Sequence, residues 1–225
     1  MTRRLLPLLI VLPLTVLCAF PPAEKNIRYV ALGDSYTICT GAKQEESWPV
    51  LLASDLKKKG IDVTLVANPA RNGYTTTDLI EQELPVLETS KPHFVTLCIG
   101  VNDWVQGVDS ARFKKNFVLI LDRVQKTLPD KQKLIVLTIP DFSVTPSGKL
   151  YGNGRNISKG LEEFNAIITR EAAKRKLKVV DLYPVSKGMA NDRTLVADDE
   201  LHPSAKEYAL WEKIILPAAE EMLKK

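Results

Sequence analysis

The feature of this sequence that most constrains its fold is the regular alternation of short apolar runs with longer amphipathic segments. The short runs are rich in β-branched residues, which is typical of strands, and the segments between them have helical periodicity. Two runs, FVTLCIG and LIVLTIP, contain no charged residue, as expected for parallel strands buried on both faces. The sequence therefore predicts an α/β fold, a three-layer α/β/α sandwich around a five-stranded parallel sheet. Strands are expected at 27–32, 63–66, 94–99, 134–139 and 179–182, and helices at 48–59, 76–87, 111–128, 158–176 and 204–223.

Residues 1–22 are predicted to be a signal peptide. Arg3 and Arg4 precede an uncharged apolar run over 5–17, and small residues and prolines follow it. A basic start, a short apolar core and small residues near a break are the pattern of secretory signals. The run is shorter than the about 20 residues that span a bilayer, and two prolines interrupt it, so no stable membrane span is expected after cleavage.

Cleavage of this segment would leave one domain over 26–225, secreted or located in the periplasm or cell envelope. Cys18 offers an alternative, because it resembles the lipid-modified cysteine of lipoproteins, although Leu17 stands where those signals usually have Gly, Ala or Ser. After cleavage only Cys39 and Cys98 remain. Cys98 lies within a predicted strand and Cys39 lies beyond the end of another, so we expect two free thiols at different heights along the sheet.

The composition and the missing motifs exclude several classes of ligand. Basic and acidic residues number 31 and 27, and no long Lys/Arg run is present, so no nucleic-acid partner is expected. The cysteines have no CxxC spacing and the chain has only two histidines, so no metal site is expected. The sequence also has no GxGxxG or GxxxxGK[ST] motif for nucleotides, and no cofactor is expected. The absence of GxSxG argues against an ordinary α/β-hydrolase.

Four polar clusters lie after predicted strands. GDSY at 33–36, NPARNG at 68–73 and GVND at 100–103 follow the first three strands, and DELHP at 199–203 lies beyond the fifth. Open parallel sheets bind ligands beyond the carboxyl ends of their strands. Each cluster alone would also suit a turn or a helix cap, because Gly, Asn, Asp and Ser are common there. The four together predict a catalytic site.

The residue types in these clusters are those of nucleophilic catalysis. The hydroxyl of Ser35 needs a base to become a nucleophile, and the imidazole of His202 can take its proton and later protonate the leaving group. A carboxylate is needed to orient the imidazole and to stabilise its charged form. Asp199, three residues before the histidine, can reach it through a turn, and Asp198 is the rival candidate.

The order and spacing of the clusters resemble the SGNH hydrolases, also called GDSL esterases and lipases. The letters S, G, N and H correspond here to Ser35, Gly73, Asn102 and His202. The resemblance covers nearly the whole chain after the predicted signal, with Tyr36 in place of the Leu of the GDSL name. It implies a flavodoxin-like SGNH hydrolase fold and a serine esterase that forms an acyl-enzyme.

The resemblance also implies the roles of individual residues. The family spacing places the acid three residues before the histidine, at Asp199. The oxyanion hole would consist of the backbone N–H groups of Ser35 and Gly73 and the side-chain amide of Asn102. Loss of one such donor typically costs about 3 kcal/mol of transition-state stabilisation. Cys39 stands where related GDSYT sequences often have glycine.

Substrate identity is constrained less than the reaction. The resemblance covers thioesterases, lysophospholipases, arylesterases and carbohydrate deacetylases, which share this constellation of residues. A chain this compact has no room for a large lid domain, so we expect a small-molecule ester with a short to single-chain acyl group. Tyr74 and Trp104, next to the expected oxyanion residues, are candidates for the substrate pocket and could equally be packing residues. The loop at 142–157 is expected to shape the site. A catalytically inactive flavodoxin-like binding domain or surface interaction domain is the alternative.

Overall fold

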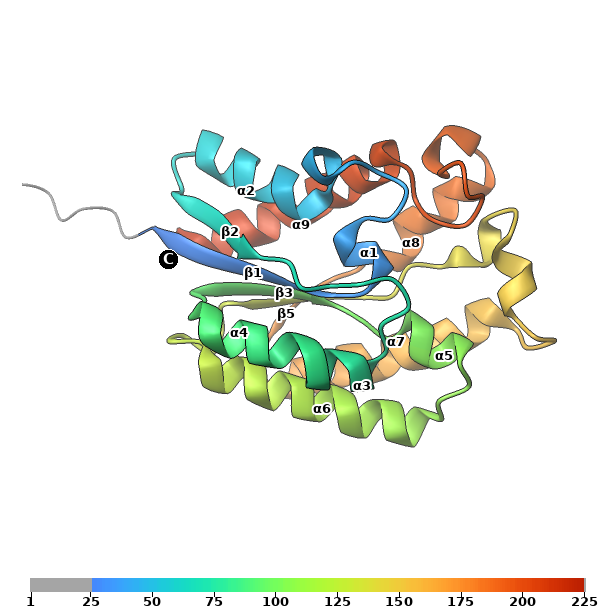
Figure 1. The fold of residues 1–225 in the computed structure, drawn as a ribbon, viewed down its shortest axis with the longest axis horizontal. Coiled ribbons are helices and arrows are strands. Elements are labelled where there is room, and N and C mark those ends of the chain that lie inside the picture. The colour runs from blue at the N-terminus through green and yellow to red at the C-terminus, as the bar shows by residue number, and fades with distance from the viewer. Residues whose placement is uncertain (1–25, 225) are drawn as a thin grey trace, which may run out of the picture.

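The computed structural model describes residues 26–224 and has the expected α/β/α architecture. A five-stranded parallel sheet with the strand order β2-β1-β3-β4-β5 forms the middle layer (Figure 1). The predicted signal peptide, with Cys18, lies outside the described residues. The strands are β1 (Ile27–Gly33), β2 (Val63–Ala67), β3 (Phe94–Cys98), β4 (Leu134–Leu137) and β5 (Lys178–Val180).

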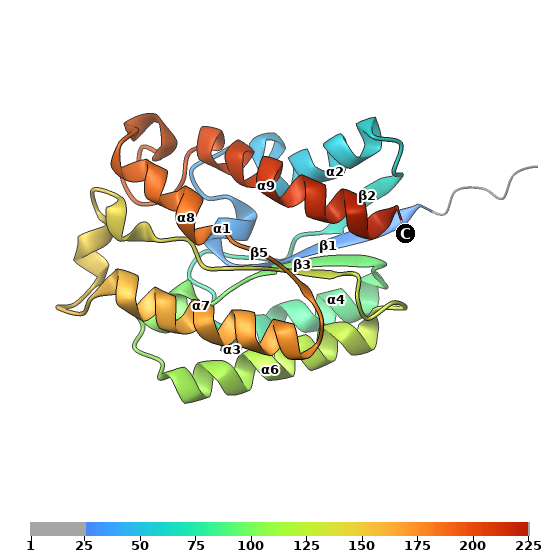
Figure 2. The same cartoon turned by 180° about the vertical axis from the view of Figure 1, so that it is seen from behind.

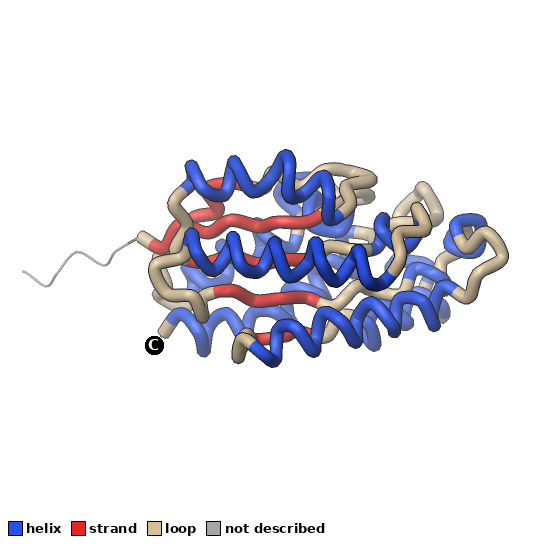
Figure 3. Tube along the Cα trace, turned by 90° about the horizontal axis from the view of Figure 1, so that it is seen from below, coloured by secondary structure: helices blue, strands red, loops and turns tan. Residues whose placement is uncertain are grey.

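Helices cover both faces of the sheet. On one face α2 (Trp48–Lys58) and α9 (Ala205–Leu223) pack against each other (Figures 1 and 2). The other face is covered by α4 (Leu84–Ser90), α6 (Ser110–Thr127) and α7 (Ile157–Lys174), which run alongside the strands in Figure 3. Every residue of β3 and β4 is buried between these layers, as their uncharged sequences predict.

The strands and four of the five helices agree with their predicted bounds to within two residues. The segment expected to form one helix at 76–87 is instead divided into α3 (Thr76–Asp78), a π-helical turn (Leu79–Glu83) and α4. A continuous α-helix would need the N–H of Pro85 to bond the carbonyl of Glu81, and proline has no such hydrogen. The wider π turn accommodates this and leads into α4, with the proline in its first turn.

The carboxyl ends of the strands meet at one edge of the sheet, on the right of Figure 1. The short helices α1 (Ser35–Ile38) and α5 (Val101–Val105) begin there, directly after β1 and β3. Cys39 and Cys98 are both buried free thiols, as expected, and Cys98 pairs with Gly33 in the sheet register. No helix between residues 26 and 224 is both long enough and apolar enough to span a bilayer.

Candidate active site

Ser35 stands at the turn between β1 and α1. Gly33 ends the strand, and a Cβ there would lie only 2.2 Å from the carbonyl oxygen of Cys98. Asp34 caps the helix, because its Oδ1 accepts a hydrogen bond of 3.0 Å from the N–H of Tyr36. Ser35 is the first residue of α1, where a backbone N–H has no partner within the helix. The turn therefore presents both the hydroxyl and the N–H of Ser35 at the carboxyl edge of the sheet.

The Asp-x-x-His segment forms a closed turn before α9. Asp199 Oδ2 lies 2.6 Å from His202 Nδ1, and Asp199 Oδ1 accepts from the N–H groups of Leu201 and His202 at 3.0 and 2.9 Å. Burial by itself would raise the pKa of Asp199, but these backbone and imidazole hydrogen bonds together lower it. Asp198 is exposed, and its carboxylate has no partner within 26–224. Of the two candidate acids, Asp199 is the one that contacts the histidine.

Asn102 lies in the first turn of α5, where β3 ends. Its Nδ2 donates one hydrogen to the carbonyl of Tyr74 at 2.9 Å, which leaves a second hydrogen on the same amide. Gly73, one residue before Tyr74, has φ +80°, a value that favours glycine, and a Cβ there would meet open space. Asp103 accepts a hydrogen bond of 2.8 Å from the N–H of Thr76. Helix α5 therefore holds the segment after Gly73 through two side chains, Asn102 and Asp103.

A small pocket joins these groups. Its volume is about 80 Å³, and Ser35, Asn102 and His202 all line it. The other lining residues are mainly apolar or aromatic, namely Tyr36, Val101, Val105, Phe142, Tyr151 and Leu201. Two of them, Phe142 and Tyr151, come from the long loop after β4, which was expected to shape the site. No pattern in the sequence distinguished these two side chains from the rest of the loop. Gly73 and Tyr74 do not line the pocket.

Trp104 is buried behind the pocket and does not line it. The guanidinium of Arg155 lies 4.1 Å from the centroid of its ring, and Phe142 meets it edge-on at 6.4 Å. A Cβ at Gly160 would approach Trp104 Nε1 to 1.7 Å, so α7 packs directly on the indole. In this structure Trp104 supports the pocket wall through Phe142.

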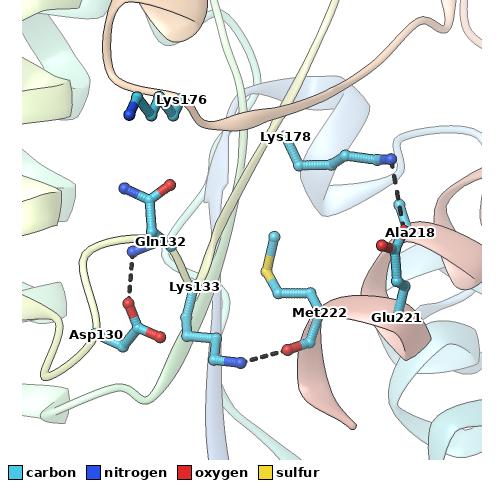
Figure 4. A pocket seen from close by; sticks show the side chains of 8 residues that line it. All are labelled: Asp130, Gln132, Lys133, Lys176, Lys178, Ala218, Glu221 and Met222. Atoms are coloured by element: carbon cyan, nitrogen blue, oxygen red, sulfur yellow. Dashed lines mark hydrogen bonds and ion pairs between the residues drawn. The ribbon is translucent and has the colours of Figure 1, made fainter. Parts of the chain in front are cut away.

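A larger hollow, of about 290 Å³, lies at the opposite edge of the sheet (Figure 4). It lies where β4 and β5 begin and is lined by Lys133 and Lys178 among others. Lys133 donates to the carbonyl of Met222, and Lys178 faces Glu221 at 3.8 Å (Figure 4). These lysines hold the end of α9, and none of the serine, asparagine or histidine groups above lies there. Within 26–224 no cluster of three or more His, Cys, Asp or Glu residues could hold a metal ion.

Comparison with known proteins identifies the family. The model of the GDSL-like lipase/acylhydrolase family matches residues 31–210. The chain belongs to this family. This chain is 24% identical to esterase TesA of Pseudomonas aeruginosa, in an alignment that covers 78% of this chain and 79% of that protein. It is 29% identical to an arylesterase of Vibrio mimicus over 60% of its own length and 66% of that protein.

Solved structures share the fold of this acylhydrolase. A psychrotrophic esterase, EstA, from a Pseudoalteromonas species superposes with a TM-score of 0.70 at 20% identity, covering 89% of this chain and all of that one. An acetylxylan esterase from Geobacillus stearothermophilus superposes with a TM-score of 0.68 at 18% identity, covering 86% and 94% of the two chains. These structures confirm the three-layer fold expected from the sequence, and the family match confirms the expected assignment as an ester hydrolase.

The end of α1 combines backbone strain with side-chain burial. Its C-cap, Cys39, adopts the left-handed conformation with φ 62° and ψ 55°. Glycine adopts that conformation without steric cost, whereas a residue with a Cβ does so at a cost of about 1–2 kcal/mol. Cys39 also buries its side chain, since only 1% of the residue is exposed. Packing of the thiol therefore offsets backbone strain at the end of α1.

Proposed function

We propose that this protein is a serine esterase that hydrolyses carboxylic esters through an acyl-enzyme on Ser35. The observation that carries the proposal is one pocket lined by Ser35, Asn102 and His202, in which the imidazole is oriented by Asp199. A metal or cofactor has no part in this reaction scheme. Each of the four side chains has a role that its geometry supports.

In the first half of the reaction, His202 Nε2 accepts the proton of the Ser35 hydroxyl as Oγ attacks the ester carbonyl carbon. Asp199 keeps the other ring proton on Nδ1, which leaves Nε2 free to act as the base. Collapse of the tetrahedral intermediate breaks the bond to the alcohol oxygen, which takes the proton from His202. Water then repeats the sequence on the acyl-enzyme, releasing the carboxylic acid and restoring Ser35.

The negative charge of the tetrahedral oxygen needs donors that are already in place. The proposed donors are the N–H groups of Ser35 and Gly73 and the second amide hydrogen of Asn102. None of these three hydrogens donates to another residue in the described part of the chain. The bond from Asn102 to Tyr74 fixes the amide before substrate arrives, so the donor needs no reorganisation during the reaction.

The proposed substrates are esters of short acyl chains, with single longer chains tolerated only if they extend out of the pocket. The pocket, of about 80 Å³, is small beside the roughly 300–1,000 Å³ of sites that enclose a drug-sized ligand. Its apolar wall suits a hydrocarbon acyl group. An aryl ester and an acetylated sugar, the substrates in the names of two relatives, both fit this class. A series of p-nitrophenyl esters from acetate to laurate, beside acetylated xylose and an acyl-CoA, would rank these classes.

We further propose that residues 1–22 direct export and that residues 26–225 form the hydrolase domain. The protein would then act in the periplasm, at the envelope or outside the cell. Intact-mass measurement of the protein recovered from cell fractions tests this, because it gives the cleavage position and detects a lipid on Cys18. A full-length mass in the cytoplasmic fraction would contradict export.

Labelling with a fluorophosphonate tests the nucleophile. The wild-type protein should gain one phosphonyl group, located on Ser35 by peptide mapping, and should lose its esterase activity in parallel. Ser35→Ala should take up no label and should lose nearly all activity, with its circular dichroism spectrum unchanged. Ser54→Ala, at an exposed position of α2, is the matched control and should behave as wild type. Wild-type protein that neither labels nor hydrolyses esters would favour the inactive binding domain.

A further inference from the structure

Glu83 is a fully buried carboxyl group that the proposed mechanism does not use. It is the last residue of the π-helical turn between α3 and α4, on the helical layer beneath β1 (Figure 1). Its Oε2 accepts a hydrogen bond of 3.0 Å from the N–H of Gly33. Its Oε1 is buried and has no hydrogen-bond partner among the described residues. Burial of a carboxyl group with one oxygen lacking a hydrogen bond costs free energy of folding, so a compensating role is expected.

The contact of Glu83 is with the strand end that carries the nucleophile. Strand β2 ends at Ala67, which pairs with Val30 of β1. Strand β1 extends three residues farther, to Gly33, without a partner in β2. Two residues after this glycine comes Ser35. A side chain cannot replace the hydrogen atom of Gly33, since a Cβ would lie 2.2 Å from the oxygens of Cys98 and Thr37. The backbone there has little freedom, and Glu83 holds one of its hydrogen-bonding groups.

The surroundings of Glu83 favour its neutral form. Burial raises its pKa to about 9, and the nearby carboxylates of Asp34 and Asp78 add to the effect, whereas the Gly33 N–H and Arg71 oppose it. Burial likewise raises the pKa of Asp34 to about 8, with a further contribution from Asp103. Asp34 Oδ2 is a second buried oxygen without a partner in residues 26–224. A negative charge on Glu83 would therefore repel its neighbours and oppose the oxyanion that forms beside Ser35.

We propose that Glu83 is a positioning residue for Ser35. The Glu83 carboxyl group anchors the Gly33 N–H and thereby fixes the turn that presents the nucleophile. The inference rests on the proposed function of Ser35. Glu83 touches no substrate, and its effect on catalysis passes through the backbone of residues 33–35. We therefore expect kcat to depend on an acceptor oxygen at position 83 and on the charge of that side chain. KM should change little when either is altered.

The test compares Glu83→Gln with Glu83→Leu. The amide of glutamine keeps the acceptor oxygen and cannot ionise, so kcat at pH 7 should stay within about threefold of wild type. Leucine removes the acceptor, and kcat should fall about tenfold or more while KM changes less than about threefold. Above pH 8 the wild-type kcat should decline as the buried carboxyl ionises, and Glu83→Gln should lack part of that decline. A purely packing role would also tolerate glutamine, which has nearly the shape of glutamate, but it would predict no change in the pH profile of kcat.

Glu212→Gln is the matched control, because Glu212 is also a buried carboxyl with an unpartnered oxygen among the described residues. It lies on α9, and the charged groups near it are Asp55 and Lys58 of α2, Lys59 just after α2, and Lys213. Its pH profile of kcat should match that of wild type. If Glu83→Leu does not fold, the profile of Glu83→Gln decides, and an alkaline limb identical to that of wild type would overturn the inference. Retention of wild-type kcat by a folded Glu83→Leu would also overturn it. Both results are compatible with an inactive Ser35→Ala, so they leave the proposed function intact.

Discussion

Replacement of Asp199 by asparagine tests the proposed acid most sharply, because it changes chemistry while preserving shape. The Oδ1 atom of asparagine can still accept from the N–H groups of Leu201 and His202, now at 3.0 and 2.9 Å, so the turn should remain. The amide group would then face His202 Nδ1, where the carboxylate oxygen now lies at 2.6 Å. An amide donates a hydrogen, so the imidazole would carry its own proton on Nε2 and could not act as a base.

The expected loss of kcat is about 10²- to 10³-fold, or roughly 3–4 kcal/mol of transition-state stabilisation. A fully enclosed acid in a serine protease triad is associated with about 10⁴. The smaller value follows from exposure, since the side chain of Asp199 is 42% exposed and water can partly solvate the imidazolium in its place. KM should change little, because the carboxylate contacts the base and not the substrate.

The assay is steady-state hydrolysis of p-nitrophenyl acetate, with circular dichroism to verify folding. Asp198→Asn is the matched control, and its kcat should stay within about twofold of wild type because the Asp198 carboxylate is exposed and has no described partner. Equal losses at the two positions would refute the assignment of Asp199. A larger loss at Asp198 would transfer the role to that residue.

Four further outcomes are expected. Asn102→Ala should lower kcat about 10²- to 10³-fold with little change in KM, and a change confined to KM would show that the amide binds the ground state. Tyr151→Ala, at the partly exposed rim of the pocket, should shift the preference among p-nitrophenyl esters toward longer acyl chains, and an unchanged chain-length ranking would place Tyr151 outside the acyl site. For Glu83 the folded pKa is raised, so its contribution to stability is fully present below the unfolded pKa of about 4.3 and is lost as pH rises toward about 9. The melting temperature of Glu83→Gln should accordingly rise relative to that of wild type from pH 5 to pH 9. Equal changes of melting temperature with pH in the two proteins would contradict a buried neutral carboxyl. Iodoacetamide should alkylate neither Cys39 nor Cys98 in the native protein and both after unfolding, because both thiols are buried and burial raises their pKa, whereas a cross-linked peptide would contradict two free thiols.

Local sequence patterns were sufficient for the architecture and for the candidate catalytic residues. Strand and helix bounds follow the period of apolar residues, because each element must bury one face or one stripe against its neighbours. The polar clusters could be recognised because turns and caps at strand ends use few residue types, and Asp199 and His202 meet within a single turn. Ser35 and Asn102 follow neighbouring parallel strands, so the topology alone brings them to the same edge.

Tertiary packing decided the features that depend on where a side chain points once distant segments meet. Trp104 was a candidate for the pocket by its position beside Asn102, but the close approach of α7 at Gly160 buries its ring behind the wall. Phe142 and Tyr151 form that wall because the loop after β4 contacts α5 through Trp104, a contact with no periodic signal in the sequence. The role proposed for Glu83 likewise depends on a π turn that brings a residue 50 positions along the chain under Gly33. Sequence encodes burial and turn chemistry locally, whereas contacts between distant segments depend on the shape of every side chain packed between them.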